Sequence, residues 1–135
     1  MKSLEWKDSY SVGVKALDEQ HQILLNHLNT IYQLFDDPSQ KERIGVLLSE
    51  LEDYALVHFK TEEDLFAKHR YHSQEQQAKE HRLYEQKISD FRARFDSSDQ
   101  KVTVDMLEFL ADWLTGHILG SDHEYKRYLN NSGVF

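Results

Sequence analysis

Apolar residues recur at alternating intervals of three and four positions in four separate stretches of this chain. This interval matches one face of an α-helix, to which side chains return about every 3.6 residues. The stretches cover about 18–35, 39–69, 73–95 and 103–120. Their apolar members are Leu24, Leu28, Ile31 and Phe35; Ile44, Leu47, Leu51, Tyr54 and Leu65; Tyr84, Ile88, Phe91 and Phe95; and Met106, Leu110 and Trp113. The sequence therefore predicts four amphipathic helices.

Breaking and capping residues mark where these helices start and stop. The only proline, Pro38, follows two aspartates and ends the first helix, because proline cannot continue the backbone hydrogen-bond ladder. Ser39 with Glu42, and Ser73 with Gln76, have the spacing of capping boxes. We therefore expect the second and third helices to begin at these serines.

Short connections between four amphipathic helices predict an antiparallel, up-down four-helix bundle. The polar stretch 96–100 is expected to be a loop, and the fourth helix to meet a break at Gly120. The segments 1–17 and 124–135 lack a clear period, and the first is expected to pack on the bundle as an N-terminal arm through Trp6, Tyr10 and Val12. The length suits one domain, so 1–135 is assigned to a single all-α domain.

Composition and charge argue against several classes of protein. The net charge of −8 repels phosphate backbones and anionic lipid, so we expect no nucleic-acid partner and no membrane insertion. There is no run of about eighteen apolar residues, and the start of the chain lacks the apolar core of a secretory signal. The absence of cysteine removes disulfides, thiolate metal sites and thiol nucleophiles. These features favour a cytoplasmic protein.

A few polar residues interrupt the apolar stripes. In the second helix, the series 47, 51, 54, 58, 62, 65 is apolar or aromatic except at His58 and Glu62. The polar residues in line with the other three stripes are His21, Gln77, His81 and His117. Helical geometry points all of these side chains at the bundle axis.

The same residues are expected to lie at one height in the bundle. In an antiparallel bundle, the start of the first helix is level with the end of the second, the start of the third and the end of the fourth. The polar members of the stripes lie near those four ends. We therefore expect one polar layer at one end of the core, with apolar stripes below it.

Such a layer needs compensation, since burying unpaired polar groups is costly, and a metal ion is the natural candidate. Imidazoles and carboxylates without sulfur suit iron, zinc or manganese. Asp122, five residues after His117, would turn inward only if the helix is distorted near Gly120. A lone histidine on an apolar stripe is usually a hydrogen-bonded core residue, but convergence of four favours metal binding. The other histidines, expected in solvent, are His27, His69, His72 and His123.

The sequence resembles the hemerythrin family, and specifically the bacterial hemerythrins, over nearly its whole length. The resemblance begins with W-K-D-S-Y-S-V-G-V at 6–14 and D-E-Q-H at 18–21. It continues with H-F-K-T-E-E at 58–63, K-E-H at 79–81, and W-L-T-G-H-I at 113–118 with Asp122. Together these spaced motifs are highly specific, although each alone would be weak.

The resemblance implies two iron ions bridged by Glu62, Asp122 and an oxo or hydroxo group. One iron would be held by His21 and His58 and would keep an open position for dioxygen. The histidines of the other iron would be His81 and His117.

One position departs from the family pattern. Four residues before His81 the family has a further histidine on the second iron, and here that residue is Gln77. An amide oxygen is a poor iron ligand beside a neutral imidazole. Three outcomes follow: a more open site, weaker binding of the second iron, or replacement by His72. We favour the more open site.

The resemblance implies dioxygen binding rather than enzyme activity. The residues around His117 that would form the apolar wall of the ligand pocket are Trp113, Leu114 and Ile118. The protein would serve as a free carrier or store, or as a dioxygen or redox sensor module that precedes a C-terminal signalling output domain. A di-iron oxidase or a zinc-dependent protein is the alternative. The paired Glu-x-x-His motifs of ferritin-like oxidases and the His-Glu-x-x-His motif of metalloproteases are both absent.

Overall fold

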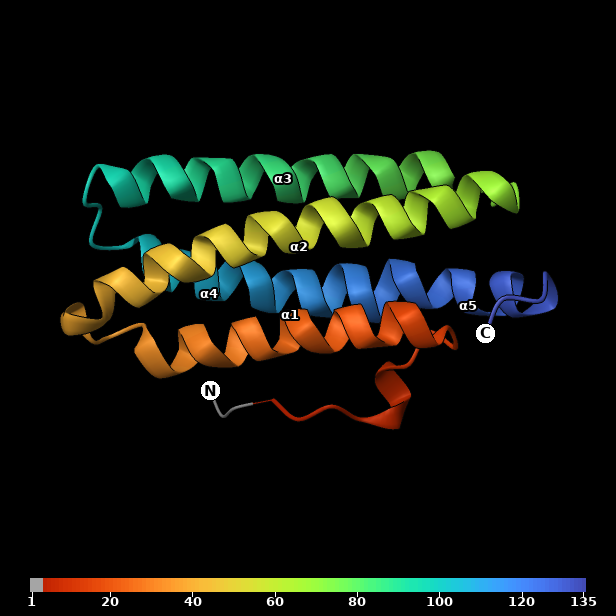
Figure 1. Cartoon of the computed structure of the whole chain (residues 1–135), viewed down its shortest axis with the longest axis horizontal. Helices are drawn as coiled ribbons and strands as arrows, with labels where there is room; N and C mark the ends of the chain where they lie inside the picture. The colour runs from red at the N-terminus through yellow and green to blue at the C-terminus, as the bar shows by residue number, and fades with distance from the viewer. Residues whose placement is uncertain (1–3) are drawn as a thin grey trace.

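The computed structural model describes residues 4–135 and forms four antiparallel helical rods (Figure 1). The helices are α1 (Lys15–Leu34), α2 (Lys41–Lys68), α3 (Gln74–Asp96), α4 (Val102–Trp113), η3 (Leu114–Ser121) and α5 (Asp122–Asn131). Two short 3-10 turns, η1 (Asp8–Tyr10) and η2 (Pro38–Gln40), precede α1 and α2. α4, η3 and α5 follow one another directly as the fourth rod. The predicted all-α four-helix bundle is confirmed.

The fourth rod differs from the sequence prediction. It does not break at Gly120, because the helix widens there into a π-helical segment, η3, and continues as α5. A π-helical turn accommodates an extra residue without ending the backbone hydrogen bonding. The segment 124–135, for which no period was found, is helical as far as Asn131.

The two predicted capping boxes do not form. The backbone N–H and the hydroxyl of Ser39 both donate to Oδ1 of Asp37, at 3.0 and 2.6 Å. This local turn competes with capping, and Gln40 becomes the N-cap of α2 without a side-chain bond. Ser73 is the N-cap of α3 as expected, but its side chain makes no capping hydrogen bond.

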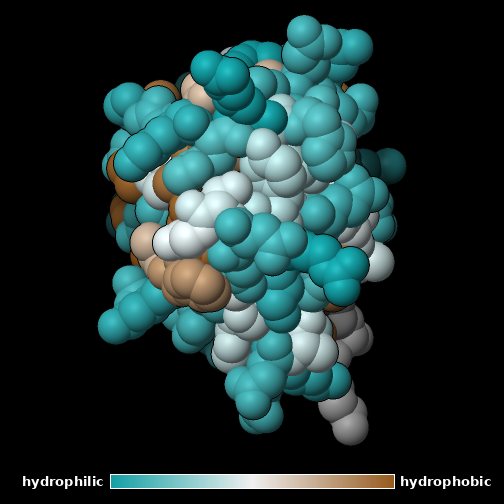
Figure 2. All heavy atoms as spheres, turned by 90° about the vertical axis from the view of Figure 1, so that its right-hand side faces the viewer, coloured by the Kyte–Doolittle hydropathy of each residue, from teal (hydrophilic) through white to brown (hydrophobic). Residues whose placement is uncertain are grey.

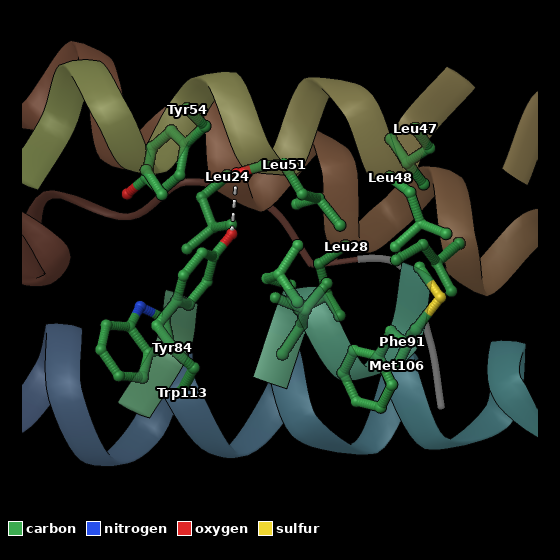
Figure 3. Close-up of a cluster of buried hydrophobic side chains, with 14 of the residues drawn as sticks. Leu24, Leu28, Leu47, Leu48, Leu51, Tyr54, Tyr84, Phe91, Met106 and Trp113 are labelled. Carbon is green, nitrogen blue, oxygen red and sulfur yellow. Dashed lines mark hydrogen bonds between the residues drawn. The ribbon is translucent and has the colours of Figure 1, made fainter. Parts of the chain in front are cut away.

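Two apolar clusters fill the core. The larger one lies between the four rods, and Figure 3 shows part of it, including Leu24, Leu51, Tyr54, Tyr84 and Trp113. The smaller one lies at the end of the bundle where α1 begins and consists of Val12, Val14, Leu17, Phe66, Tyr71, Tyr125 and Leu129. Figure 2 views this end of the molecule, whose surface is mainly hydrophilic.

The N-terminal arm packs on the bundle, as predicted. The backbone N–H of Leu4 donates to Oδ1 of Asn29 at 2.7 Å, and Trp6 packs against the larger cluster. Val12 is buried in the smaller cluster. Gly13 has a φ of +73°, and a Cβ atom there would lie 2.8 Å from a side-chain oxygen of Asn130. Glycine therefore allows the arm to meet α5 closely.

No helix within residues 4–135 is both long enough and apolar enough to cross a membrane.

Candidate metal centre

The buried polar residues of the structure form one layer. Within residues 4–135, the only buried polar or charged residues are His21, His58, Glu62, Gln77, His81, His117 and Asp122. These are the seven positions singled out from the sequence, and each is at most 2% exposed. The layer was predicted to lie at one end of the core, but it lies between the two apolar clusters. The smaller cluster was not predicted; it combines residues of the terminal segments with Phe66 of α2 and Tyr71 of the turn after α2, and it covers the other side of the layer.

The two carboxylates of the layer each lie between two histidines. Oε1 of Glu62 is 3.1 Å from Nε2 of both His58 and His81. The Asp122 carboxylate lies between the remaining two histidines: Oδ2 is 3.0 Å from Nε2 of His21, and Oδ1 is 3.1 Å from Nε2 of His117. The layer thus has a histidine pair on each side and two carboxylates across the middle.

The donor atoms of the layer fall into two overlapping groups, and the atoms in each group lie within 4.8 Å of one another. One group comprises His21, His58, Glu62 and Asp122, and the other comprises Glu62, His81 and His117. Glu62 is the residue common to both. An arrangement of this kind can hold two cations side by side.

The position of Asp122 depends on the π-helical segment. His117 and Asp122 are five residues apart, and in a π-helix residues five apart share a face. The prediction that a distortion turns Asp122 inward therefore agrees with the geometry, although the distortion is a widened turn and not a break at Gly120. π-helical turns of this kind are frequent at functional sites.

Gln77 faces Asp122 with its amide nitrogen. Nε2 of Gln77 donates to Oδ1 of Asp122 at 3.1 Å, while the Gln77 carbonyl oxygen is buried without a partner. His72 is exposed in the turn between α2 and α3 and belongs to neither donor group. The structure thus does not bring His72 to the layer.

Three of the four histidine rings are held from outside the layer. The Nδ1 atoms of His58, His81 and His117 face carboxylate or amide oxygens. Their partners are Gln20 at 2.5 Å, Glu63 at 3.0 Å and Glu80 at 2.9 Å, respectively. In a neutral ring, an N–H donated outward leaves the Nε2 lone pair facing the layer, which is the form that binds a metal. These partners were not predicted from the sequence, because each adjoins a site residue in the chain and lies off the apolar stripes.

Aromatic rings lie flat against the same histidines. Trp113 stacks on His117 with ring centroids 4.0 Å apart and planes at 16°. Tyr54 stacks on His58 at 5.0 Å and 17°, and Phe59 stacks on His81 at 3.9 Å and 5°. The three residues predicted to form a pocket wall, Trp113, Leu114 and Ile118, are all buried. The wall is not wholly apolar, because it includes the Trp113 indole N–H, which is buried and has no hydrogen-bond acceptor.

Tyr125 is a further residue of the layer that was not predicted from the sequence. Its hydroxyl donates to Oε2 of Glu62 at 2.7 Å, from a fully buried position in α5. The periodicity of α5 was not recognised, so this tyrosine was not placed on an inward face. Within α5 it follows Asp122 by three residues, and that spacing was the available signal.

We expect Tyr125→Phe to weaken metal binding by roughly 10- to 100-fold, because the outer hydrogen bond that orients Glu62 is lost. Competition with a chelator of known affinity would measure the change. Tyr128→Phe is a matched control, since the Tyr128 hydroxyl donates to backbone carbonyls of His69 and Arg70. Equal affinities for the two variants would contradict a role for Tyr125 in the site.

Charges within the layer shift the protonation of its members. Burial alone would lower the pKa of His117, but the charge of Asp122, with hydrogen bonds to Asp122 and Glu80, outweighs it and raises that pKa to about 10. Burial lowers the pKa of His58, which favours its neutral form. Burial alone would raise the pKa of Glu62, but the neighbouring histidines hold it well below its ordinary value.

We expect metal loading at pH 7 to release about one proton per chain from His117, because a metal-bound imidazole must be neutral. In the metal-free protein, the raised pKa stabilises the fold fully below the ordinary value of 6.5, and this contribution is lost as the pH rises toward about 10. Proton release in weakly buffered solution and unfolding free energies between these pH values would test both statements. No release, or stability that increases over this range, would contradict them.

The geometry of the layer itself supports binding of a metal ion. Although they lie about 3 Å apart, several inward-facing atoms form no hydrogen bond of normal geometry. These atoms are Oε1 of Glu62, Nε2 of His81, Nε2 of His117 and Oδ2 of Asp122. Buried nitrogen and oxygen atoms that converge without hydrogen bonds of normal geometry are unfavourable unless a cation binds them. The nitrogen and oxygen donors, without sulfur, suit iron among the transition metals.

The sequence model of the family described as the hemerythrin HHE cation binding domain matches residues 12–129. This chain belongs to the hemerythrin family. A bacteriohemerythrin of Clostridium acetobutylicum is 31% identical to this hemerythrin over 124 residues, which cover 89% of this chain and 96% of the relative. A bacteriohemerythrin of Stenotrophomonas maltophilia is 27% identical over 134 residues, with 96% and 86% covered.

The fold of this hemerythrin also matches solved structures. A crystal structure of wild-type hemerythrin aligns with a TM-score of 0.84 at 26% sequence identity, covering 93% of this chain and 97% of that chain. A hemerythrin-like protein of Naegleria gruberi is 32% identical over 124 residues, which cover 92% of each chain. The family resemblance inferred from the motifs is therefore confirmed.

Proposed function

We propose that this hemerythrin binds dioxygen reversibly at a pair of iron ions in the buried polar layer. The observation that supports the proposal is the position of the two carboxylates. Glu62 and Asp122 each lie 3.0–3.1 Å from histidines on both sides of the layer. A carboxylate in that position can bridge two cations. The family description, a cation binding domain, agrees with this assignment.

The proposal gives each residue of the layer a role. One iron would be held by His21 and His58, and the other by His81 and His117. Glu62 and Asp122 would contribute carboxylate oxygens to both ions. When bound, the irons supply the electrons that dioxygen accepts.

The protein's own residues position the metals and exclude water. The outer partners of the histidines fix their rings, and the buried side chains of Trp113, Leu114 and Ile118 would form the wall that excludes water from the layer. A mainly apolar wall disfavours the escape of a charged species, which would need solvation. We propose binding and not substrate oxidation, because the layer contributes four histidines and only two carboxylates, whereas ferritin-like oxidase sites use four carboxylates.

Gln77 gives the second iron a more open site in this proposal. The Gln77 amide N–H donates to Asp122, so this side chain acts as a hydrogen-bond donor at a position where a ligand would present a lone pair. We propose that the second iron therefore has a position for water or an exogenous ligand. Dioxygen or redox sensing is the second candidate function, since easy oxidation of such a site suits a switch.

We expect Gln77→His to slow autoxidation several-fold, because an added imidazole would complete the coordination of the second iron. The decay of the oxygenated protein's absorption bands would measure the rate. Gln74→His, at an exposed position at the start of α3, adds a histidine outside the layer and should leave the rate unchanged. An unchanged rate in Gln77→His would argue against an open second site.

Anaerobic reconstitution tests the proposed function. Ferrous iron is added to the metal-free protein, the bound iron is counted per chain, and the optical spectrum is followed through repeated cycles of air and vacuum. Two irons per chain with visible bands that appear in air and disappear under vacuum are expected. No visible band with iron, together with tight binding of one zinc in a parallel titration, would favour the zinc alternative, and irreversible bleaching with substrate turnover would favour an oxidase.

A further inference from the structure

Tyr54, one of the aromatic residues that stack on the histidines, carries a buried hydrogen-bond donor without an acceptor. Tyr54, on α2, is 7% exposed, and its hydroxyl has no hydrogen-bond partner among the described residues. A buried hydroxyl without a partner costs free energy, so an acceptor is expected to meet it in the working protein. Tyr54 was assigned only to the apolar stripe of its helix from the sequence.

The Tyr54 hydroxyl is directed toward the polar layer. Figure 3 shows it pointing away from the Leu47 and Met106 side of the core, toward the end of the bundle that holds the layer. The Tyr54 ring lies parallel to that of His58, one helical turn further along α2, with centroids 5.0 Å apart. The donor therefore lies on the side of the layer formed by His21 and His58, whose Nε2 atoms are 3.1 Å apart.

The side chains of the polar layer leave the Tyr54 hydroxyl unused. Neither Glu62 nor Asp122 accepts a hydrogen bond from it, although the Tyr54 ring stacks on His58. The hydroxyl is therefore a donor that lies beside the layer and has no acceptor within residues 4–135.

We propose that Tyr54 is a ligand-binding residue, whose hydroxyl donates a hydrogen bond to the small molecule or anion bound on the His21–His58 side. The inference rests on the proposed function, since the ligand is one that binds to the metal on that side. The class of ligand it favours is a small anion with a terminal lone pair, such as azide. A charged acceptor gains most from such a donor in a buried site.

Tyr54→Phe and Tyr84→Phe form a matched pair for the test. Both variants remove one buried hydroxyl from the aromatic residues beside the polar layer, but the Tyr84 hydroxyl donates to the backbone carbonyl of Leu51 at 3.4 Å (Figure 3). Iron content and thermal unfolding are measured first in both variants. Two irons per chain in each would show that the metal site is intact, so that a failure of the proposed function is recognised separately.

The probe is azide added to the oxidised, iron-loaded protein. We expect Tyr54→Phe to weaken azide binding about tenfold and Tyr84→Phe to leave it unchanged. The infrared stretching frequency of bound azide should shift between H2O and D2O in the natural protein and in Tyr84→Phe, and this shift should disappear in Tyr54→Phe. If iron is bound but the natural protein shows no shift, the inference is overturned, even if Tyr54→Phe does not fold. Equal azide affinities in the two variants would also overturn it.

Discussion

Glu62→Gln should leave the protein folded but unable to retain iron. Glu62 is fully buried and is the one residue common to both groups of donor atoms. Glutamine has nearly the same shape, so the packing around it is kept. Its neutral amide oxygen is a much weaker iron ligand than a carboxylate and cannot bridge two cations. Iron content after desalting should fall from about two per chain to well below one.

Glu50→Gln is the control for this prediction. Glu50 is on the same helix, and its side chain is 53% exposed, facing His27 at 3.4 Å. This variant should keep the iron content of the natural protein. If Glu62→Gln retained both irons after desalting, Glu62 would not be a bridging ligand.

Iron should raise the thermal midpoint of unfolding by about 10 to 20 °C. Free ferrous iron at about a thousand times its dissociation constant stabilises the folded state by about 4 kcal/mol, and each kcal/mol is worth roughly 3 to 5 °C in a domain of this size. The physical reason is that the metal-free layer leaves buried nitrogen and oxygen atoms without partners. Anaerobic calorimetry with and without ferrous iron would measure the shift.

The same titration in Glu62→Gln separates specific from general effects. Iron should not raise the midpoint of this variant, because its layer cannot hold the ions. A midpoint of the natural protein that does not change with iron would mean that the layer tolerates burial without a cation. An equal rise in both proteins would mean that iron binds elsewhere.

The polar layer could be predicted from the sequence because helical periodicity fixes which way a side chain points. His58 and Glu62 continue an apolar series at intervals of four, so they face the axis wherever that series does. The antiparallel order then brings His21, His81 and His117 to the same height. Both inferences need only the period of the helix and short connections.

Features that depend on irregular backbone or on tertiary contacts could not be predicted in the same way. The π-helical turn that brings Asp122 into line with His117 violates the 3.6-residue period. The widened turn also shifts the register of α5, which hid the inward position of Tyr125. The partners Gln20, Glu63 and Glu80 lie off the stripes, and their role appears only when neighbouring helices are placed.

Tyr54 illustrates the remaining limit of periodicity. A tyrosine on an apolar stripe satisfies the pattern through its ring, while its hydroxyl can face a site that the pattern does not describe. The direction of the Tyr54 hydroxyl along the helix axis, and its lack of an acceptor, can be seen only in the packed structure.

Anomalous scattering at the iron absorption edge, from crystals of the reconstituted protein, tests the central claim most directly. We expect two peaks inside the bundle, one beside His21 and His58 and the other beside His81 and His117, with Glu62 and Asp122 touching both. A single peak, or iron bound at the surface while the histidines and carboxylates contact only one another, would contradict the account.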